Sequence, residues 1–474
     1  MGKLTIMALQ RHYLLPFFFI IISFVASRCT NLQQEDPLYL SVDDLSSNDD
    51  GGTFKNLIKQ STDVLTLKSF GKLGNKSSSL KTVNVDDYGA EGDSKTDDTK
   101  AFEKAWEEAC SSEEPVKLVV PEKSYLLMPT RFSGPCESNI DVQISGCLEA
   151  SDDPSDYSED RYHWIIFDGI ENLSVQGGGT IHGNGNRWWK NSCKRSKKKS
   201  CKHAPTAVTF YKCKDLLVRN LTFKDAQQMH VSFQHSTNVK VSGLTVTAPG
   251  DSPNTDGIHV TNTENIQISS STIATGDDCI SIVSGSKNVQ ATNITCGPGH
   301  GISIGSLGKG KSKDIVSDVT VDGAKFSGTS NGVRIKTWQG GSGSVTNIKF
   351  QNIEMDNATN PIIINQYYCD QKKPCKEEHS AVQIMNVTYR NIKGTSAHDV
   401  AVKFDCSKHF PCQGIVLQEI GLQRQGGEAA EAYCKNVQFS YIGDVFPRCP
   451  EGGLKIFLQT ILSWFDHKVP CKIQ

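Results

Sequence analysis

Adjacent aspartates are the first feature of this sequence that could do chemistry. Asp-Asp pairs occur six times, and most read as solvated turn residues. Asp277 and Asp278 differ from the rest because they lie in a stretch of regular period, one repeat after Asp256. Two unit charges about 5 Å apart, at an effective dielectric near 20, repel by roughly 3 kcal/mol, or about two pKa units. One of the three carboxyls should therefore keep its proton in mildly acidic solution.

A protonated carboxyl beside ionised carboxylates is the arrangement that hydrolysis of a glycosidic bond requires. One group protonates the leaving oxygen and another activates water. The competing interpretations of Asp277 and Asp278 are a solvated turn and a calcium site. The second is disfavoured because the sequence lacks the oxygen-rich loop repeats of known calcium motifs.

Three cationic or titratable residues follow the aspartates at the same period. His300 lies in GPGHGISIGSLG, and Arg334 and Lys336 lie in GVRIKTW. Strand alternation puts Arg334 and Lys336 on one face, where the pair could hold a carboxylate, Arg by a bidentate contact and Lys as a point charge. A lone histidine is more often structural, and Arg and Lys on a strand more often form a solvated face. Their place beside Asp278 favours function.

A repeated phrase indicates which elements position these residues. GIHV at 257 recurs as CISI at 279, GISI at 301, GVRI at 332 and PIII at 361, and a second phrase runs in parallel as NVKV at 238, NIQI at 265, NVQA at 288 and NIKF at 347. Two short strands per period of 20 to 30 residues, with little helix, are typical of stacked β-coils. The sequence therefore predicts an all-β chain folded as a right-handed parallel β-helix.

Aligning the phrases separates the two faces of the repeated strand. One face carries two aliphatic ladders, which we expect to form the interior: Ile258, Ile280, Ile302, Val333 and Ile362, and Val260, Ile282, Ile304, Ile335 and Ile364. The alternate positions should point outward: His259, Ser281, Ser303, Arg334 and Ile363. Asp256, Asp278, His300 and Asn331 precede the strands and should form a column at the strand entrances.

Four segments are expected along the chain. Residues 1–28 read as a signal peptide, with an apolar run from Tyr13 to Val25, and 29–81 as a disordered linker or pro-segment. Residues 82–449 form the β-helix, and an amphipathic helix at 97–110 should cover its open end. Residues 450–474 form an atypical C-terminal tail.

Composition points to an exported protein. The chain has 50 Lys and Arg against 52 Asp and Glu, so no global field favours a nucleic acid or a membrane surface as a partner. Sixteen cysteines fit an oxidising compartment, and the loops 369–375 and 406–412 are candidates for disulfides. A zinc site is disfavoured because there is no CxxC pair. Sequons for N-glycosylation stand at Asn75, Asn172, Asn220, Asn293, Asn357 and Asn386.

Four segments resemble the signature motifs of the polygalacturonase family, glycoside hydrolase family 28. They are NTDGIHV, TGDDCISI, GPGHGISIGSLG and GVRIKTWQGGSG, and their order and spacing match the family across some 90 residues. Their wording is most similar to plant members. The resemblance extends from about Thr82 to about Cys449. It implies a secreted, extracellular enzyme of the plant cell wall that acts alone, as a monomer and without cofactor or metal, on the α-1,4 bonds of the galacturonic acid backbone of pectin.

The resemblance also implies a role for each motif residue. Asp277 corresponds to the general acid, Asp256 and Asp278 to the pair that activates water for an inverting attack, and His300 to a residue that assists protonation of the acid. Substrate contacts fall on Asn254, Arg334, Lys336 and Tyr368, with Tyr367 as the alternative to its neighbour. Whether cleavage is endo or exo stays open.

Two other functions compete with hydrolysis. A pectate lyase uses the same scaffold and substrate but cleaves by elimination with calcium, and a non-catalytic β-helix would only bind cell walls. The intact aspartates and His300 argue against the second. The basic run KRSKKKSCKH at 194–203 could grip anionic polysaccharide or be a solvated loop.

Overall fold

The computed structural model describes residues 80–195 and 203–450, apart from 372 and 374, and these belong to one compact unit, 77–474. The signal peptide at 1–28, nearly all of the segment 29–81, and the tail beyond 450 lie outside the described residues. Within them, no helix is long and apolar enough to cross a membrane.

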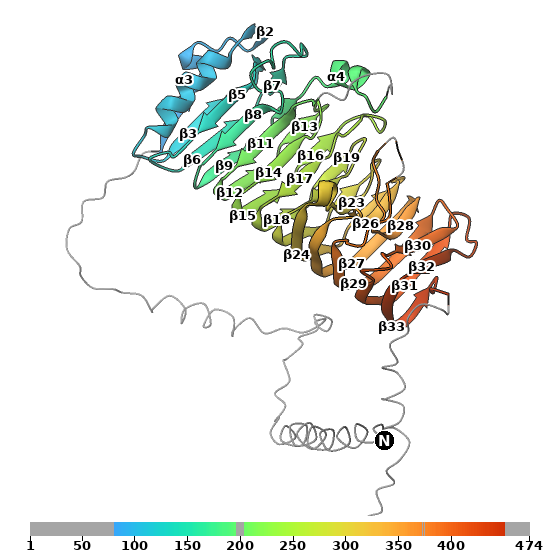
Figure 1. The fold of residues 1–474 in the computed structure, drawn as a ribbon. Coiled ribbons are helices and arrows are strands. Elements are labelled where there is room, and N and C mark those ends of the chain that lie inside the picture. Colours follow the sequence, from blue (N-terminus) through green and yellow to red (C-terminus); the bar gives the residue numbers. More distant parts are fainter. Residues whose placement is uncertain (1–79, 196–202, 372, 374, 451–474) are drawn as a thin grey trace, which may run out of the picture. The chain divides into compact units, whose positions relative to one another are not determined.

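The chain winds through successive coils whose strands stack in parallel ladders (Figure 1). One ladder holds the repeated phrase of the sequence, and each strand pairs with the next one a coil away. In stacking order its strands are β5 (Thr130–Ser133), β8 (His163–Asp168), β11 (Thr206–Tyr211), β14 (Val231–Gln234), β17 (Ile258–Thr261), β20 (Ile280–Ile282), β23 (Ile302–Leu307), β26 (Asn331–Thr337), β28 (Asn360–Asn365), β30 (Val400–Asp405) and β32 (Glu431–Lys435). We call this the site ladder.

The Asn-initiated phrase falls in a second ladder, again with parallel pairing throughout. Its strands are β1 (Lys81–Asn84), β3 (Val116–Val120), β6 (Ile140–Ile144), β9 (Leu173–Gln176), β12 (Lys214–Arg219), β15 (Thr237–Ser242), β18 (Glu264–Ser269), β21 (Lys287–Thr292), β24 (Lys313–Asp322), β27 (Ser342–Ala358), β29 (Gln383–Ser396), β31 (Cys412–Arg424) and β33 (Val437–Phe446).

Shorter strands form a third ladder that merges with the second at β27. They are β2 (Asp93–Asp97), β4 (Ser124–Leu127), β7 (Cys147–Ala150), β10 (Thr180–His182), β13 (Thr222–Lys224), β16 (Thr245–Thr247), β19 (Thr272–Ala274), β22 (Thr295–Cys296) and β25 (Lys325–Ser327). The three ladders enclose the interior, so the predicted parallel β-helix is confirmed.

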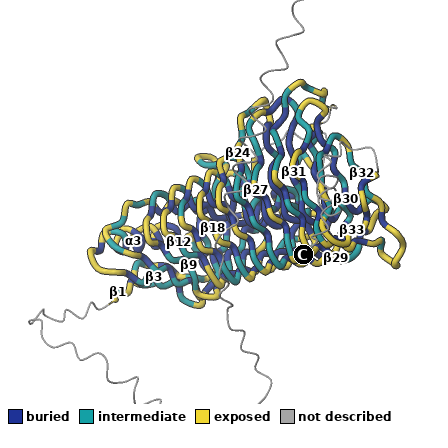
Figure 2. The backbone as a smooth tube through the Cα atoms, turned by 90° about the horizontal axis from the view of Figure 1, so that it is seen from below, coloured by how far each residue is buried: buried dark blue, intermediate teal, exposed yellow. Residues whose placement is uncertain are grey.

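Aliphatic and aromatic side chains fill this interior. Buried and more exposed residues alternate along the strands (Figure 2). Ile258, Ile280 and Ile302 stack in register and are fully buried, as predicted. Phe210 continues the interior toward the N-terminal coils, where it stacks between Phe167 and Phe233 at centroid distances of 5.2 and 5.3 Å. Burial of these ladders is what fixes the register, because a slip of one residue would turn every side chain to the other face.

Asparagines in the Asn-initiated phrase occupy a bend that needs left-handed backbone. Asn238, Asn265 and Asn288 have φ values of 58°, 59° and 52°, a region that asparagine tolerates better than most residues. Their amides also bond from coil to coil: Asn265 Nδ2 donates to Asn238 Oδ1 at 3.2 Å, and Asn288 Nδ2 donates to Asn265 Oδ1 at 2.8 Å. The recurring asparagine is therefore explained by the backbone.

Helix α3 (Thr99–Cys110) covers the first coils, as the amphipathic pattern predicts (Figure 1). Phe102, Ala105, Trp106 and Ala109 are buried against the interior. The helix begins two residues later than expected, because Asp97 ends β2 and Asp98 accepts hydrogen bonds from the backbone of Glu91 at 2.7 Å and Gly92 at 3.2 Å. The carboxylate of Asp98 thus holds the loop that leads into the helix and forms no capping hydrogen bond with the helix.

A second helix, α4 (Asn186–Asn191), is absent from the sequence-based expectations, which contain only one helix. Two short 3₁₀ turns, η1 (Val85–Tyr88) and η2 (Lys309–Lys311), complete the described elements. Both predicted short disulfide loops are confirmed, as Cys369–Cys375 and Cys406–Cys412.

Candidate active site

The aspartates lie where the chain enters β17 and β20 of the site ladder, and the loops there are held by close backbone contacts. Glycine is required at Gly276, because a Cβ atom there would lie 2.0 Å from the carbonyl oxygen of Ser252. Gly301, next to His300, has a φ of +84°, and a Cβ atom would lie 2.1 Å from the carbonyl oxygen of Asn331. Both glycines let consecutive coils approach closely enough to bring their polar side chains together.

Asp277 is the meeting point of two predicted site residues. His300 Nδ1 lies 2.9 Å from Asp277 Oδ1, and Asn254 Nδ2 donates to Asp277 Oδ2 at 3.2 Å. Asn254 has a left-handed φ of 57°, which aims it back across the loop. Both carboxylate oxygens of Asp277 are therefore engaged by groups from the two neighbouring coils.

Asp278 is 1% exposed and sits among cations. Its Oδ1 accepts from Arg334 Nη2 at 2.6 Å and from Ser303 Oγ at 2.8 Å, while its Oδ2 accepts from Lys336 Nζ at 2.8 Å. Burial of a carboxylate is costly without such partners. Arg334 and Lys336 thus contact a site aspartate directly, an arrangement that alternation alone did not reveal.

Asp256 heads a short polar chain on the outward face. Ser281 Oγ donates to Asp256 Oδ2 at 2.7 Å, and His259 Nδ1 lies 2.7 Å from Ser281 Oγ. His259 and Ser281 are direct neighbours in the register of β17 and β20. The outward positions predicted from alternation therefore include groups that hold two of the aspartates, Ser281 on Asp256 and Ser303 on Asp278.

The pKa values of the two titrating aspartates move in opposite directions. Burial, and then the neighbouring charge of Asp277, raise the pKa of Asp256. Burial acts in the same direction on Asp277, but the hydrogen bond and charge of His300, with the charge of Lys336, outweigh it and lower the pKa of Asp277. The hydrogen bond to Asp277 raises the pKa of His300 against the effect of burial. These shifts favour the protonated forms of Asp256 and His300 and the ionised form of Asp277.

Tyr368 is the tyrosine that faces the site. The Nζ atom of Lys336 lies 5.4 Å from the centre of its ring, and Trp338 packs edge-on against it at 5.5 Å. Tyr367 points elsewhere, with its hydroxyl accepting from the backbone of Lys408 at 3.3 Å. The geometry favours Tyr368 over its neighbour as a substrate contact.

Ligand atoms of Asp277, Asp278 and His300 lie within 4.8 Å of one another, a spacing compatible with a metal ion. The electrostatics oppose one, because Arg334 and Lys336 already neutralise Asp278 at hydrogen-bond distance. A divalent cation would have to displace or repel both. The donor set fits acid–base chemistry better than metal binding.

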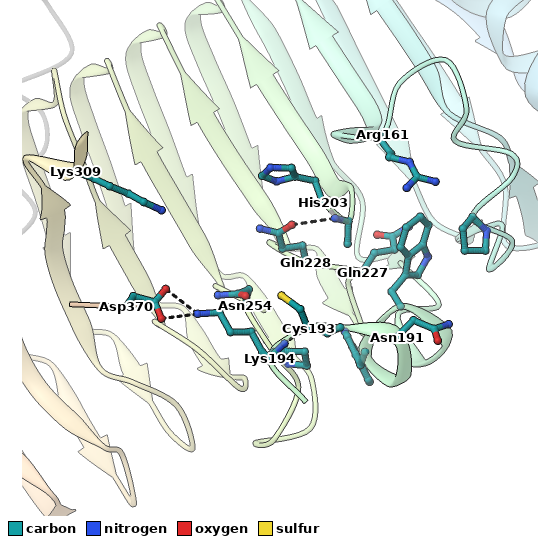
Figure 3. A pocket seen from close by; sticks show the side chains of 16 residues that line it. Arg161, Asn191, Cys193, Lys194, His203, Gln227, Gln228, Asn254, Lys309 and Asp370 are labelled. Carbon is teal, nitrogen blue, oxygen red and sulfur yellow. Dashed lines mark hydrogen bonds and ion pairs between the residues drawn. The ribbon is translucent and has the colours of Figure 1, made fainter. Parts of the chain in front are cut away.

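A cavity of about 770 Å³ is lined by residues that include Gln228, Asn254 and Asp370 (Figure 3). Asn254 forms part of its wall, which links it to Asp277. Lys194 and Asp370 meet across 2.6 Å at its rim, although 176 residues separate them in sequence. Of the basic run at 194–203, Lys194 and Arg195 are thus paired, with Asp370 and Asp251, and residues 196–202 lie outside the described part.

Three carboxylates at the strand entrances of a parallel β-helix, with a histidine on one and two cations on another, define a glycoside hydrolase. The family model "Glycosyl hydrolases family 28" matches residues 110–444. The chain belongs to this family.

Curated relatives from plants support the same assignment. The chain is 53% identical over 467 residues to "Polygalacturonase" from Malus domestica, covering 94% of this chain and 100% of that protein. It is 60% identical over 371 residues to "Polygalacturonase-2" from Solanum lycopersicum, covering 78% and 81%.

Solved structures share the fold. Endo-xylogalacturonan hydrolase from Aspergillus tubingensis aligns with a TM-score of 0.66 at 25% identity, covering 79% of this chain and all of that one. The polygalacturonase from Erwinia carotovora aligns with a TM-score of 0.63 at 21% identity, covering 79% of this chain and 99% of that one.

Proposed function

We propose that this chain is a polygalacturonase that hydrolyses the α-1,4 bonds between galacturonic acid residues of pectin, with inversion. The observation that carries the proposal is the joining of Asp277 to His300 at 2.9 Å within one site that also holds Asp256, Asp278 and two cations. The site supplies a proton, a base and a counter-charge for an acidic sugar. Family membership and the plant relatives support the same substrate.

In this proposal Asp277 protonates the leaving oxygen. Its own pKa is lowered in the free enzyme, so the proton that it delivers is held by His300, whose pKa is raised by the same hydrogen bond. A sugar that binds over the pair excludes water and removes the solvation that favours the ionised carboxylate. The proton then moves from Nδ1 to the carboxylate and on to the glycosidic oxygen.

Water is activated on the other side by Asp256 and Asp278. Asp278 forms ion pairs with Arg334 and Lys336, while Asp256, whose pKa is raised, must lose its proton to act as a base. Carboxylate oxygens of Asp277 and Asp278 lie within 4.8 Å of each other, closer than the roughly 6.5 to 9.5 Å common between acid and base in inverting enzymes, so inversion is proposed from family membership and not from this spacing. In this proposal the activation of water therefore depends on the loss of a proton from Asp256, whose pKa is raised.

Arg334 and Lys336 keep donors for a substrate carboxylate after their contacts with the protein. Arg334 uses Nε on Ser303 and Nη2 on Asp278, and a guanidinium has five N–H donors. Lys336 uses one of three donors on Asp278. Tyr368 and Asn254 complete the binding residues in this proposal, one beside Lys336 and the other beside Asp277.

The raised pKa of Asp256 also favours a reversed assignment, in which Asp256 is the acid and Asp277 the base. Contact with His300 favours the first assignment, because a histidine that can reload the carboxylate with a proton suits the acid. Substrates with a highly acidic leaving group separate the two, because they need no general acid. Rescue by such a substrate should occur for Asp277→Asn and fail for Asp256→Asn.

We infer further that the protein is secreted to the extracellular space and acts as a monomer in the plant cell wall. Five described disulfides fit an oxidising compartment. Residues 1–28 would direct export as a signal peptide, 29–81 would be a linker or pro-segment, and 82–449 the catalytic β-helix. Size-exclusion chromatography of protein recovered from the medium of secreting plant cells tests these inferences together.

A further inference from the structure

Two exposed histidines, His379 and His409, contact each other through their rings. The ring centres are 4.6 Å apart, and the rings are inclined by 57°. His379 lies in the loop that follows β28, and His409 lies in the loop that follows β30 (Figure 1). These two strands pair in the site ladder, with Asn365 opposite Asp405 at their ends. Neighbouring strands therefore bring together two rings that are distant in sequence.

Hydrogen bonds hold the backbone on both sides of His379. The N–H of Glu378 donates to Gln339 Oε1 at 3.2 Å, and the carbonyl oxygen of Ser380 accepts from the N–H of Gly340 at 2.7 Å. The loop is thus attached to the segment that follows β26, which limits the positions that the imidazole can reach.

The backbone beside His409 is held in a comparable way. The N–H of Lys408 donates to the hydroxyl of Tyr367 at 3.3 Å, and the disulfide Cys406–Cys412 closes the loop. Anchored loops lose little conformational freedom when a ligand binds, so a smaller entropic cost opposes binding. The two imidazoles are therefore preorganised as a pair.

The pair offers nitrogen lone pairs that the protein does not use. Neither ring forms a hydrogen bond or an ion pair with another residue in the part of the chain that the structure describes. A neutral imidazole has one nitrogen with a free lone pair, and imidazole is a preferred ligand of zinc, copper and nickel. Two such nitrogens on neighbouring, anchored loops can chelate one metal ion.

The charges nearest the pair do not exclude a cation. The segments 376–379 and 408–409 carry two glutamates and two lysines: Glu377, Glu378, Lys376 and Lys408. A third lysine, Lys311, lies 3.8 Å from the carboxylate of Glu378, and none of the three lysines bonds either ring. At Asp278, in contrast, Arg334 and Lys336 already occupy the carboxylate at 2.6 and 2.8 Å. A metal ion is therefore opposed less at the histidine pair than in the active site.

We propose that His379 and His409 form a binding site for one divalent transition-metal ion, with one nitrogen of each ring as ligand and water in the other positions. Copper binds most tightly to such a site, nickel and zinc bind more weakly, and magnesium and calcium, which need oxygen ligands, do not bind. The ion links the loops that follow β28 and β30 and takes no part in hydrolysis. The inference does not rest on the proposed function.

The test measures metal binding to the full protein, purified without a histidine tag and freed of metal with a chelator. In calorimetric titrations with the chlorides of copper, nickel and zinc we expect binding in this order of affinity, and none with magnesium chloride. His379→Asn and His409→Asn should each weaken nickel binding by at least about tenfold, because even the loss of a group that only orients a ligand costs that much. His235→Asn is the matched control, because His235 is exposed and its ring contacts Tyr211 instead of a second histidine.

Nickel should also raise the melting temperature of the unchanged protein and leave that of His379→Asn unchanged, because a ligand that binds only the folded state stabilises it. Melting temperatures without metal check that the variants are folded. Nickel binding should persist in His300→Asn, since the active-site group of Asp277, Asp278 and His300 is the other candidate for a metal in the described residues.

The histidine site would be overturned by nickel binding that is unchanged in His379→Asn or His409→Asn, by its loss in His300→Asn, or by a protein that binds none of the three metals. None of these results would affect the proposed function, which fails separately if the metal-free enzyme cleaves no galacturonan.

Discussion

His300 Nδ1 lies 2.9 Å from Asp277 Oδ1, and this contact ties the protonation of the two groups together. The pKa of His300 is raised and that of Asp277 is lowered. The pair of a protonated imidazole and an ionised carboxylate therefore persists over a wider pH range than it would without these shifts. The imidazole is 42% exposed, which means that solvent screens the attraction. The contact between His300 and Asp277 should therefore affect catalysis more than it affects the stability of the fold.

The pH dependence of activity should show this coupling. In the proposed mechanism activity needs Asp256 ionised, and its pKa is raised above the usual 3.8, so the acid limb should lie above that value. Activity also needs the proton on His300, so it should fall as pH rises through a pKa above the usual 6.5. In His300→Asn the alkaline limb should lose this group and kcat should drop about 10²-fold. An unchanged alkaline limb would remove His300 from the proton path.

The pH dependence of the stability of the folded state should follow from the same pKa shifts of His300 and Asp277. The raised pKa of His300 gives a contribution that is present below about pH 6.5 and lost as pH rises through the folded-state pKa. The lowered pKa of Asp277 gives one that is present above about pH 3.8 and lost as pH falls. The difference in melting temperature between the unchanged protein and His300→Asn should be greatest between these limits. A difference that grew in alkaline solution would have the wrong sign.

Removal of the proposed general acid, Asp277, should abolish hydrolysis without unfolding the chain. Asp277→Asn keeps the shape of the side chain and should reduce the release of reducing ends from polygalacturonate by about 10² to 10⁴-fold. The matched control is Asp318→Asn, at a partly buried bend of β24. Persistent release of reducing ends from the Asp277 variant would refute its assignment as the acid.

Breaking the ion pair between Lys336 and Asp278 should reduce both stability and activity. Lys336→Met leaves Oδ2 of the buried Asp278 without its partner and should destabilise the fold by about 3 kcal/mol, measured by denaturant unfolding. Adding Asp278→Asn should restore most of the stability but none of the activity. Lys325→Met breaks an exposed pair with Glu354 and should cost less than about 1 kcal/mol. Comparable losses for both lysines would mean that burial of the pair is unimportant.

The aromatic stack of the interior offers a test of the fold itself. Phe210 is 1% exposed between Phe167 and Phe233, and Phe210→Ala should destabilise the protein by about 3 to 5 kcal/mol. Tyr433→Ala, at a side chain that is 43% exposed, should change stability by less than about 1 kcal/mol. If the Phe210 variant unfolded at the same denaturant concentration as the unchanged protein, the interior ladder would not be the main source of stability.

The strand phrases of the sequence were sufficient to predict the β-helix and its register. Period-two alternation decides which side chains face inward, and Ile258, Ile280 and Ile302 lie where it put them. It also grouped the site residues, because residues one repeat apart lie one coil apart. Helix α4 escaped prediction because six residues with two tryptophans carry too little periodicity to separate a helix turn from a loop.

Contacts within the site were beyond what the sequence could specify. Alternation put Arg334 on the outward face but did not predict that its guanidinium bonds Asp278, since that depends on rotamers and burial. The order of the pKa values was not predictable either. Crowding requires one carboxyl with a raised pKa, but which one it is depends on burial, which raises the pKa of Asp256, and on the hydrogen bond from His300, which helps to lower the pKa of Asp277. Ser281 and Ser303 could have been found, because they occupy the outward positions beside the aspartates.

Inverting hydrolysis of a galacturonan by this protein is tested directly by one measurement. The enzyme is incubated with polygalacturonate, and the first products are followed by proton NMR for the configuration of the new reducing end and by ultraviolet absorbance for unsaturated ends. We predict new reducing ends that appear first as the β anomer, without ultraviolet-absorbing products. Reducing ends that appear first as the α anomer, or unsaturated products, would contradict the account.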